Sequence, residues 1–273
     1  MDSTHTVISL LSTIQNKYTK TVTTRAKAAR NLQKAMMWPS SNMMKKLIKN
    51  GLIMHTNITE DDFDIADEIF GVAPEQVKGK TTAPPQKRDA SLQILLHNIK
   101  TEINKRIKLY IDIMYICGSF FLHTKSKDLN YITIHYLPDK KFSTITKKLK
   151  SVIKKYLSRG FTITDVFGDN EFGHDKYQDL FMPAILHLCA AGEHVPIIER
   201  SIRTVKERAR SATVELPFKT IPRLMIISLL EGVERWINAF PANNIDHNSI
   251  SPATIVEGRQ NPRDDAARIS CGS

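Results

Sequence analysis

The sequence predicts an α/β fold in which a mixed sheet is flanked by helices and preceded by a small helical module. Three observations support this prediction. Residues 1–77 show helical periodicity with helix-end signals, three strand-like segments follow one another between residues 107 and 137, and helices then alternate with strands. With 273 residues, 41% of them hydrophobic, the chain is long enough to bury such a core.

The expected N-terminal module, residues 1–77, is rich in helix formers and in residues that begin or end helices. One of its segments opens with a capping-box pattern from Thr59 to Asp62 and ends at Gly71. The predicted helices cover 23–37, 41–51 and 59–71.

The rest of the chain divides by composition into three parts. Residues 78–106 are expected to be a basic linker, because their first part, KGKTTAPPQKRD, has two prolines and almost nothing apolar. This linker is either a solvated tether or a segment that lies along phosphates. The core domain is expected over 107–245, and a polar tail over 246–273.

The core domain opens with a strand over 107–117, IKLYIDIMYIC, which has too many β-branched and aromatic residues for an amphipathic helix. The elements expected after it are strands over 119–126 and 131–137, a helix over 142–160, a strand over 161–167, a short helical segment around QDLFMPAI, an apolar strand LHLCAAG, and helices over 196–211 and 222–240.

The chain is basic, with 39 lysines and arginines against 28 acidic residues and a formal net charge of +11. This excess suggests a polyanionic partner such as nucleic acid, or a basic protein without one. Cys117, Cys189 and Cys271 form no zinc or disulfide pattern, which indicates a reducing compartment inside the cell. We expect no membrane partner and no secretory signal, because no apolar run of about 18 residues occurs.

Two aspartates stand where strands could bring them together. Asp112 lies inside the first core strand, where a lone carboxylate is costly unless it is paired or binds a metal. Asp169 directly follows the fourth strand, after Gly168, which we expect to allow a sharp exit. Two such charges about 4 Å apart repel by about 4 kcal/mol at an effective dielectric of 20. Uptake of a proton, or binding of Mg²⁺ or Mn²⁺, would relieve that repulsion.

The helix expected over 196–211 offers a third carboxylate, Glu199. It could complete a metal site while basic residues on the same face contact phosphates. An ordinary i,i+4 pair between Glu199 and Arg203 on a solvated helix explains the spacing as well. At helical spacing the polar face carries Glu199, Arg203, Lys206 and Arg210, and the apolar face carries Ile198, Ile202, Val205 and Ala209.

Three segments together resemble the integrase core of copia-type retrotransposon polyproteins: YIDIMYICGSFFLHTKSKDLNYITIHYL, GFTITDVFGDNEF and EHVPIIERSIRTVKERAR. The resemblance covers residues 20–262, and its most specific parts are GDNEF and HVPIIERSIRTVKERAR. It implies a ribonuclease H-like fold and a DDE motif in which Asp112, Asp169 and Glu199 are catalytic and bind Mg²⁺ or Mn²⁺.

The activity that the resemblance implies is DNA integration by divalent-metal-dependent phosphoryl transfer. This activity comprises 3′-end processing of element DNA and strand transfer into target DNA, performed by a fragment of a retrotransposon polyprotein in the nucleus or cytoplasm. Self-association is left open. The expected nucleic-acid contacts are Arg200, Arg203, Lys206 and Arg210.

The sequence also departs from this family. Asp169 and Glu199 have 29 residues between them, fewer than in retroviral relatives, which puts closure of the active site in question. The family's upstream zinc module needs a His-His-Cys-Cys set, whereas residues 1–77 contain only His5 and His55 and no cysteine. We therefore expect no zinc.

Two alternative functions remain open: a catalytically inactive, nucleic-acid-binding remnant of an integrase, and a ribonuclease H-like nuclease of another kind that hydrolyses RNA–DNA hybrids. Three nearby residues are also ambiguous. Glu171 either supports the triad or is an exposed turn acid, and His187 and His194 either take part in the site or are structural or solvated.

Overall fold

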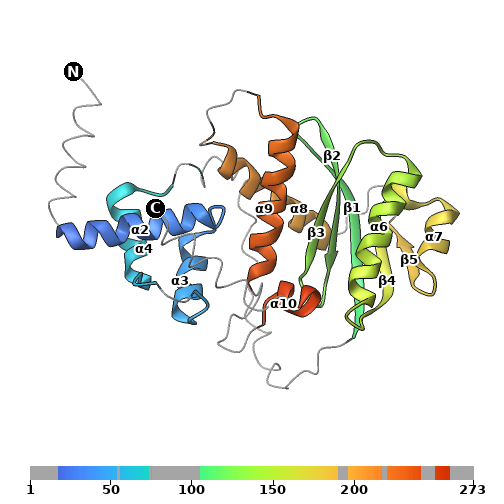
Figure 1. Ribbon diagram of the computed structural model, residues 1–273, viewed down its shortest axis with the longest axis horizontal. Coiled ribbons are helices and arrows are strands. Elements are labelled where there is room, and N and C mark those ends of the chain that lie inside the picture. The colour runs from blue at the N-terminus through green and yellow to red at the C-terminus, as the bar shows by residue number, and fades with distance from the viewer. Residues whose placement is uncertain are drawn as a thin grey trace.

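The computed structural model describes residues 18–53, 56–73, 75, 105–189, 196–214, 216, 220–240 and 250–258. Its elements form two parts that lie side by side, a group of N-terminal helices and a sheet with helices around it (Figure 1). Most of the predicted linker, and His194, lie outside the described residues. None of the described helices is long and apolar enough to cross a membrane.

The N-terminal part consists of α2 (Lys20–Ala35), α3 (Ser41–Lys49) and α4 (Glu60–Phe70). The side chains of Thr19 and Ser40 cap α2 and α3 by accepting hydrogen bonds from backbone N–H groups of the first turn. The predicted capping box of α4 is confirmed, because Asp62 accepts a hydrogen bond from the Thr59 N–H at 2.7 Å. Asp62 also pairs with Arg25 of α2 at 2.8 Å, which ties the two helices together.

The sheet contains a meander followed by two parallel strands. Its order is β3-β2-β1-β4-β5; β1, β2 and β3 pair antiparallel, whereas β4 and β5 run parallel to β1. This is the strand order of the ribonuclease H-like fold, so the predicted fold class is confirmed. The strands are β1 (Arg106–Ile116), β2 (Ser119–Ser126), β3 (Ile132–Leu137), β4 (Thr162–Gly168) and β5 (Ile185–Leu188).

A tight two-residue turn joins β1 to β2. Both of its residues, Cys117 and Gly118, have positive φ angles, 46° and 78°. Such angles match the twist of a hairpin and favour glycine at one position. Cys117 therefore belongs to the turn, whereas the sequence placed it at the end of the strand.

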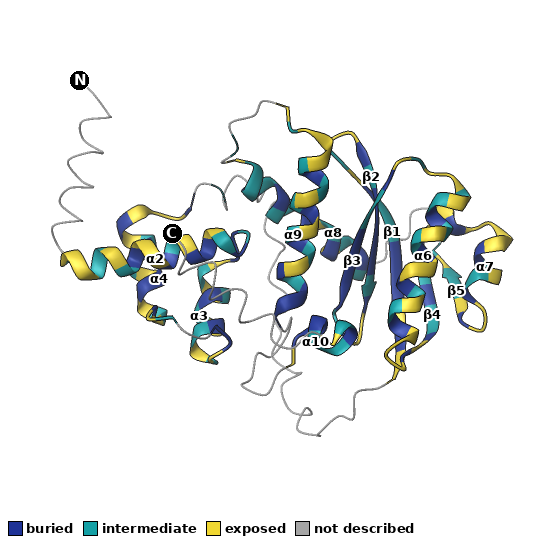
Figure 2. Ribbon diagram, viewed as in Figure 1, coloured by how far each residue is buried: buried dark blue, intermediate teal, exposed yellow. Residues whose placement is uncertain are grey.

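Helices cover both faces of the sheet, and their buried sides face it (Figure 2). One face packs against α6 (Phe142–Leu157), with Leu109, Leu122 and Leu149 in the shared core. The opposite face packs against α8 (Pro196–Thr213) and α9 (Arg223–Ala239), with Met114 and Val205 in contact. The remaining short elements are η1 (Asn170–Phe172), α7 (Asp175–Phe181) and α10 (Pro252–Glu257).

Helix α9 also closes the free edge of the sheet. The amide of Asn238 makes two hydrogen bonds with the backbone of Ile132 in β3, at 2.9 and 2.8 Å. Glu234 accepts a third, from the N–H of Ile134 at 2.8 Å. Because an unpaired edge strand can recruit another chain, these side chains both stabilise β3 and protect it.

The N-terminal helices share a hydrophobic core with the end of α9. Trp236 and Phe240 pack into the same cluster as Leu32, Met44 and Leu47. In the middle of α9, Gly232 lets the two parts approach closely. A Cβ atom there would lie 2.8 Å from Met37 Cε. The N-terminal module therefore packs directly on the core domain.

The C-terminal region differs from the expected polar tail. Within 246–273, residues 252–257 form α10, and Val256 is buried in the main core beside α6. Glu257 accepts a hydrogen bond from the hydroxyl of Tyr131 at 2.5 Å. The polar-tail prediction is therefore corrected for residues 250–258, because the few apolar residues of this segment have a place in the core that composition alone does not reveal.

Candidate functional site

Asp112 and Asp169 lie at matching positions of two adjacent strands. The parallel pairing of β1 with β4 aligns Tyr110 with Phe167. Asp112 comes two residues after Tyr110, and Asp169 comes two residues after Phe167. Adjacent strands are roughly 4.8 Å apart, so the two carboxylates share one end of the sheet. The expectation that the first and fourth strands are neighbours is confirmed.

Gly168 is needed for close packing and not for an unusual backbone angle. Its φ is not positive, and a Cβ atom at this position would lie 3.0 Å from Ile111 and 3.1 Å from Phe172. The prediction of a sharp exit is thus corrected. Asp169 follows in an extended conformation and caps η1, where its Oδ1 accepts the N–H of Asn170 at 2.6 Å.

The Asp112 carboxyl is half-buried and lies within the electric field of several other acids. Burial raises its pKa most, and the carboxylates of Asp169, Glu171 and Glu199 raise it further, in that order. A hydrogen bond from the N–H of Ile113, at 2.6 Å, acts in the opposite direction. The predicted triad is therefore one electrostatic group, to which Glu171 also contributes.

A buried histidine holds the start of α8 over this group. His123 of β2 is the register partner of Asp112 and contacts Ser201 of α8 at 2.9 Å. Its Nδ1 lies 3.2 Å from the carbonyl oxygen of Thr133, which can accept a hydrogen bond but cannot donate one. Nδ1 therefore carries the proton, and Nε2 accepts from the serine hydroxyl. Burial lowers the His123 pKa to about 3, so the ring is neutral.

Sequence reasoning missed this contact, although a histidine inside the apolar strand 119–126 was a signal for it. Pairing with Ser201 fixes the first turns of α8, and with them Glu199, near the end of β1. Among the described residues no ion pair joins Glu199 to Arg203, so the i,i+4 pair of the alternative interpretation is not present.

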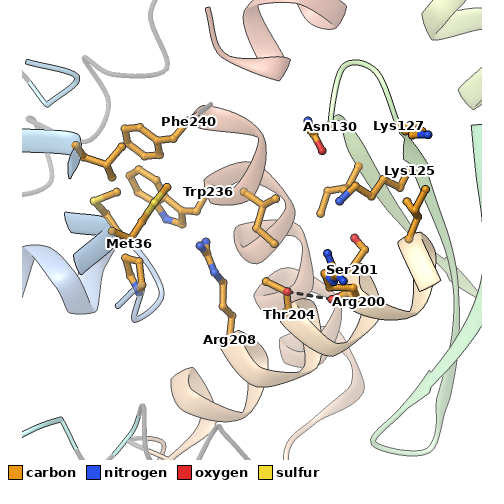
Figure 3. Close-up of a pocket in the computed structure, with 16 residues that line it drawn as sticks. Met36, Lys125, Lys127, Asn130, Arg200, Ser201, Thr204, Arg208, Trp236 and Phe240 are labelled. Carbon is orange, nitrogen blue, oxygen red and sulfur yellow. Dashed lines mark hydrogen bonds between the residues drawn. The ribbon is translucent and has the colours of Figure 1, made fainter. Parts of the chain in front are cut away.

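The two predicted faces of α8 are present. Ile198, Val205 and Ala209 are buried and Ile202 is partly buried against the sheet, as predicted. On the polar face Arg203 is exposed, while Glu199, Lys206 and Arg210 are half-buried. Arg200, which was grouped with these bases, lies on another side of the helix, beside Lys125 and Arg208 (Figure 3).

The residues around the triad have structural partners of their own. Glu171 is an exposed turn acid and pairs with Lys140 at 2.5 Å. His187 of β5 contacts Asp165 at 2.9 Å, and this contact lowers the pKa of the Asp165 carboxyl. The His187 ring also stacks on Phe167, as a structural histidine would.

The donor set fits a hard divalent cation in its chemistry. Asp112, Asp169 and Glu199 offer carboxylate oxygens, which Mg²⁺ and Mn²⁺ prefer. Their side chains are not gathered round one point: across the described ranges, no group of three His, Cys, Asp or Glu residues has the geometry of a metal site. Asp112 and Asp169 instead accept hydrogen bonds from the backbone N–H groups that follow them.

No protein-family model and no curated protein matches the chain. Among solved structures it is similar to the catalytic core domain of BIV integrase, in a crystal structure described as crystal form I. The match has a TM-score of 0.42 and 11% sequence identity, and it covers 55% of this chain and 93% of that one. At this level the similarity concerns backbone shape, and the function proposed below depends on the residues of this chain.

Proposed function

We propose that the protein is a DNA-integrating polynucleotidyl transferase of the copia type, which processes 3′ ends of element DNA and joins them to target DNA in the nucleus or cytoplasm. The observation that carries this proposal is the parallel register of β1 with β4, which puts Asp112 and Asp169 at one end of the sheet. The raised pKa of Asp112, with Glu199 among its causes, supports a third member.

Asp112, Asp169 and Glu199 would hold Mg²⁺ or Mn²⁺ through their carboxylate oxygens. When bound, such ions stabilise the charge that develops on a phosphate during in-line displacement. Burial and the other acids raise the pKa of Asp112, and a nearby cation would act in the opposite direction and favour the ionised, ligating state.

The basic residues would position the DNA. Arg203, Lys206 and Arg210 share the side of α8 that carries Glu199, so phosphates bound along this face would lead toward the acids. Because Arg203 is exposed and has no ion pair among the described residues, its guanidinium can make a bidentate contact with a phosphate.

The second candidate is a nucleic-acid-binding remnant that has lost the chemistry. It is favoured by one observation, the hydrogen bonds by which Asp112 and Asp169 turn to their own backbone and not to a common centre. Both candidates predict DNA binding, so affinity does not separate them, whereas metal-dependent joining does.

The test is the joining of a labelled duplex end to a plasmid in Mn²⁺, with the wild-type chain and Asp169→Asn. Asparagine keeps the shape and removes the charge, so joining should fall by roughly a thousandfold while DNA binding is retained. Arg203→Ala is the matched control, since it should weaken binding more than Asp169→Asn does. Equal joining by wild type and Asp169→Asn would refute the assignment of Asp169, and no joining by either would favour the remnant.

A further inference from the structure

A cavity of about 520 Å³ lies between the N-terminal helices and the core domain. Residues of α3, β2, β3, α8 and α9 line it, together with Met36 just after α2, so it is formed only when the two parts pack together (Figure 3). Its volume is within the 300–1,000 Å³ range that is typical of small-molecule sites.

Four positive charges line this cavity, and none of its described lining residues is acidic. They are Lys125, Lys127, Arg200 and Arg208, and we call the cavity the basic pocket. In the part of the chain that the structure describes, none of the four forms an ion pair. Lys125 and Arg208 are half-buried, and cations in such a position are costly without a counter-charge, so the arrangement favours an anion.

The electrostatics of two of these side chains agree with that need. Burial lowers the Lys125 pKa, and the neighbouring charge of Arg200 lowers it further. Burial alone lowers the Arg208 pKa to about 10, which still leaves the guanidinium charged at neutral pH. An incoming anion would relieve both effects.

The other end of the basic pocket is apolar. Trp236 and Phe240 stack with their rings 7° from parallel, and Met36 and Leu47 lie beside them. Figure 3 shows Arg208 reaching from α8 toward Trp236, with Lys125, Lys127 and Asn130 on the far side. One end of the lining is therefore cationic, and the other is aromatic and thioether-containing with the single cation Arg208 beside it.

We propose that the basic pocket binds a nucleotide unit, with its phosphate at Lys125 and Arg200 and its base toward Trp236. Inorganic phosphate would use only the cationic end, and an apolar ligand only the other end. A nucleotide, either free or within a single strand, matches both. This inference does not depend on the chemistry proposed for the acidic residues.

Binding is tested with the full chain in EDTA, so that no metal-dependent step intervenes. The probes are ATP, tripolyphosphate as the same anion without a base, and a fluorescein-labelled oligo(dT). The variants are Lys125→Gln and Arg208→Gln. Lys147→Gln is the control, because it also removes one positive charge, but at an exposed position on α6 that does not line the pocket. Thermal melting reports folding and ligand stabilisation, and fluorescence anisotropy reports affinity.

We expect ATP or the oligonucleotide to raise the melting temperature of the wild type more than tripolyphosphate does. Each pocket variant should weaken binding about tenfold, the scale of losing one hydrogen bond to a charged group, while Lys147→Gln should not. Without ligand, Arg208→Gln should melt no lower than wild type, because it removes a half-buried charge that has no ion pair among the described residues. If Arg208 only stabilises the fold, this substitution should instead lower the melting temperature.

Each remaining outcome has a definite meaning. Binding of ATP identifies a free nucleotide as a source, and binding of the oligonucleotide alone identifies a strand; both support the pocket if its variants lose affinity. The inference would be overturned if tripolyphosphate bound as tightly as ATP does, or if the pocket variants bound their ligands as tightly as wild type does. Binding in EDTA involves no metal-dependent joining step, so failure here is distinct from failure of the integrase proposal.

Discussion

Two groups of like charge lie on different sides of α8. The acidic group consists of Asp112, Asp169 and Glu199; Asp112 lies within β1, next to the end of β4, and Asp169 is open to solvent. The basic pocket instead lies between the two parts of the molecule, with Trp236 and Phe240 at one end. Each arrangement costs free energy without a counter-charge. The open oxygen donors suit a small hydrated cation, and the enclosed cations suit an organic anion.

The largest expected effect is on the rate of metal-dependent joining, which should distinguish the acids of the acidic group from the neighbouring acid Glu171. Asp112→Asn should reduce metal-dependent joining by roughly a thousandfold, because it removes a half-buried metal ligand. Glu171→Gln removes an exposed acid that already pairs with Lys140, and it should change the joining rate by less than about threefold. Plasmid-joining rates in Mn²⁺ measure both variants. Equal losses would mean that the acids act only through general charge.

A smaller effect is expected on DNA affinity, which should fall when a basic residue is replaced and rise when an acidic residue is replaced. If about six phosphate contacts form, log affinity should fall with log salt with a slope near −5. Arg203→Ala should reduce that slope by about 1 and lower affinity. Asp169→Asn removes a repulsion with phosphate and should raise affinity slightly. Anisotropy titrations at several salt concentrations measure this. A salt-independent affinity would contradict phosphate contacts altogether.

The smallest effect concerns a buried acid outside both groups. Burial raises the pKa of Glu234 to about 7, while its carboxyl accepts the Ile134 N–H. Its folded pKa is above its unfolded value of 4.5, so its contribution to the free energy of unfolding declines as pH rises from about 4.5 to 7. Glu234→Gln should resemble wild type at pH 4.5 and be more stable at pH 8, by on the order of 2 kcal/mol.

Urea unfolding of both proteins across this pH range gives the comparison directly. The difference between variant and wild type is the useful quantity, because the lowered pKa of buried His123 makes its own contribution in both proteins. A difference that does not change with pH would show that Glu234 keeps an ordinary pKa. It would also weaken the inference that burial governs the Asp112 carboxyl.

The sequence was informative where the signal is local or periodic. The succession of strands and helices along the chain, the faces of α8 and the capping box at Thr59 follow from residue composition, helical spacing and end residues. The neighbouring positions of Asp112 and Asp169 followed once β1 and β4 were taken as adjacent. These are regular features, in which each residue has a role that its close neighbours in sequence reveal.

The parts that could not be predicted depend on contacts between distant segments. His123 and Ser201 are 78 residues apart, and nothing in the sequence of either segment predicts contact with the other. The same holds for the basic pocket, whose lining combines Leu47 of α3 with Arg208 of α8 and Trp236 of α9. Gly168 was expected to serve a turn, whereas Ile111 and Phe172 leave no room for a side chain.

The most direct test of the central claim is to locate a bound cation. Crystals of the full chain soaked in Mn²⁺ would give an anomalous-scattering peak at each bound ion. The account predicts a peak between the carboxylates of Asp112 and Asp169, which Asp169→Asn should abolish. A saturating soak with no peak between them, or a peak that persists in Asp169→Asn, would contradict the assignment of these aspartates as metal ligands.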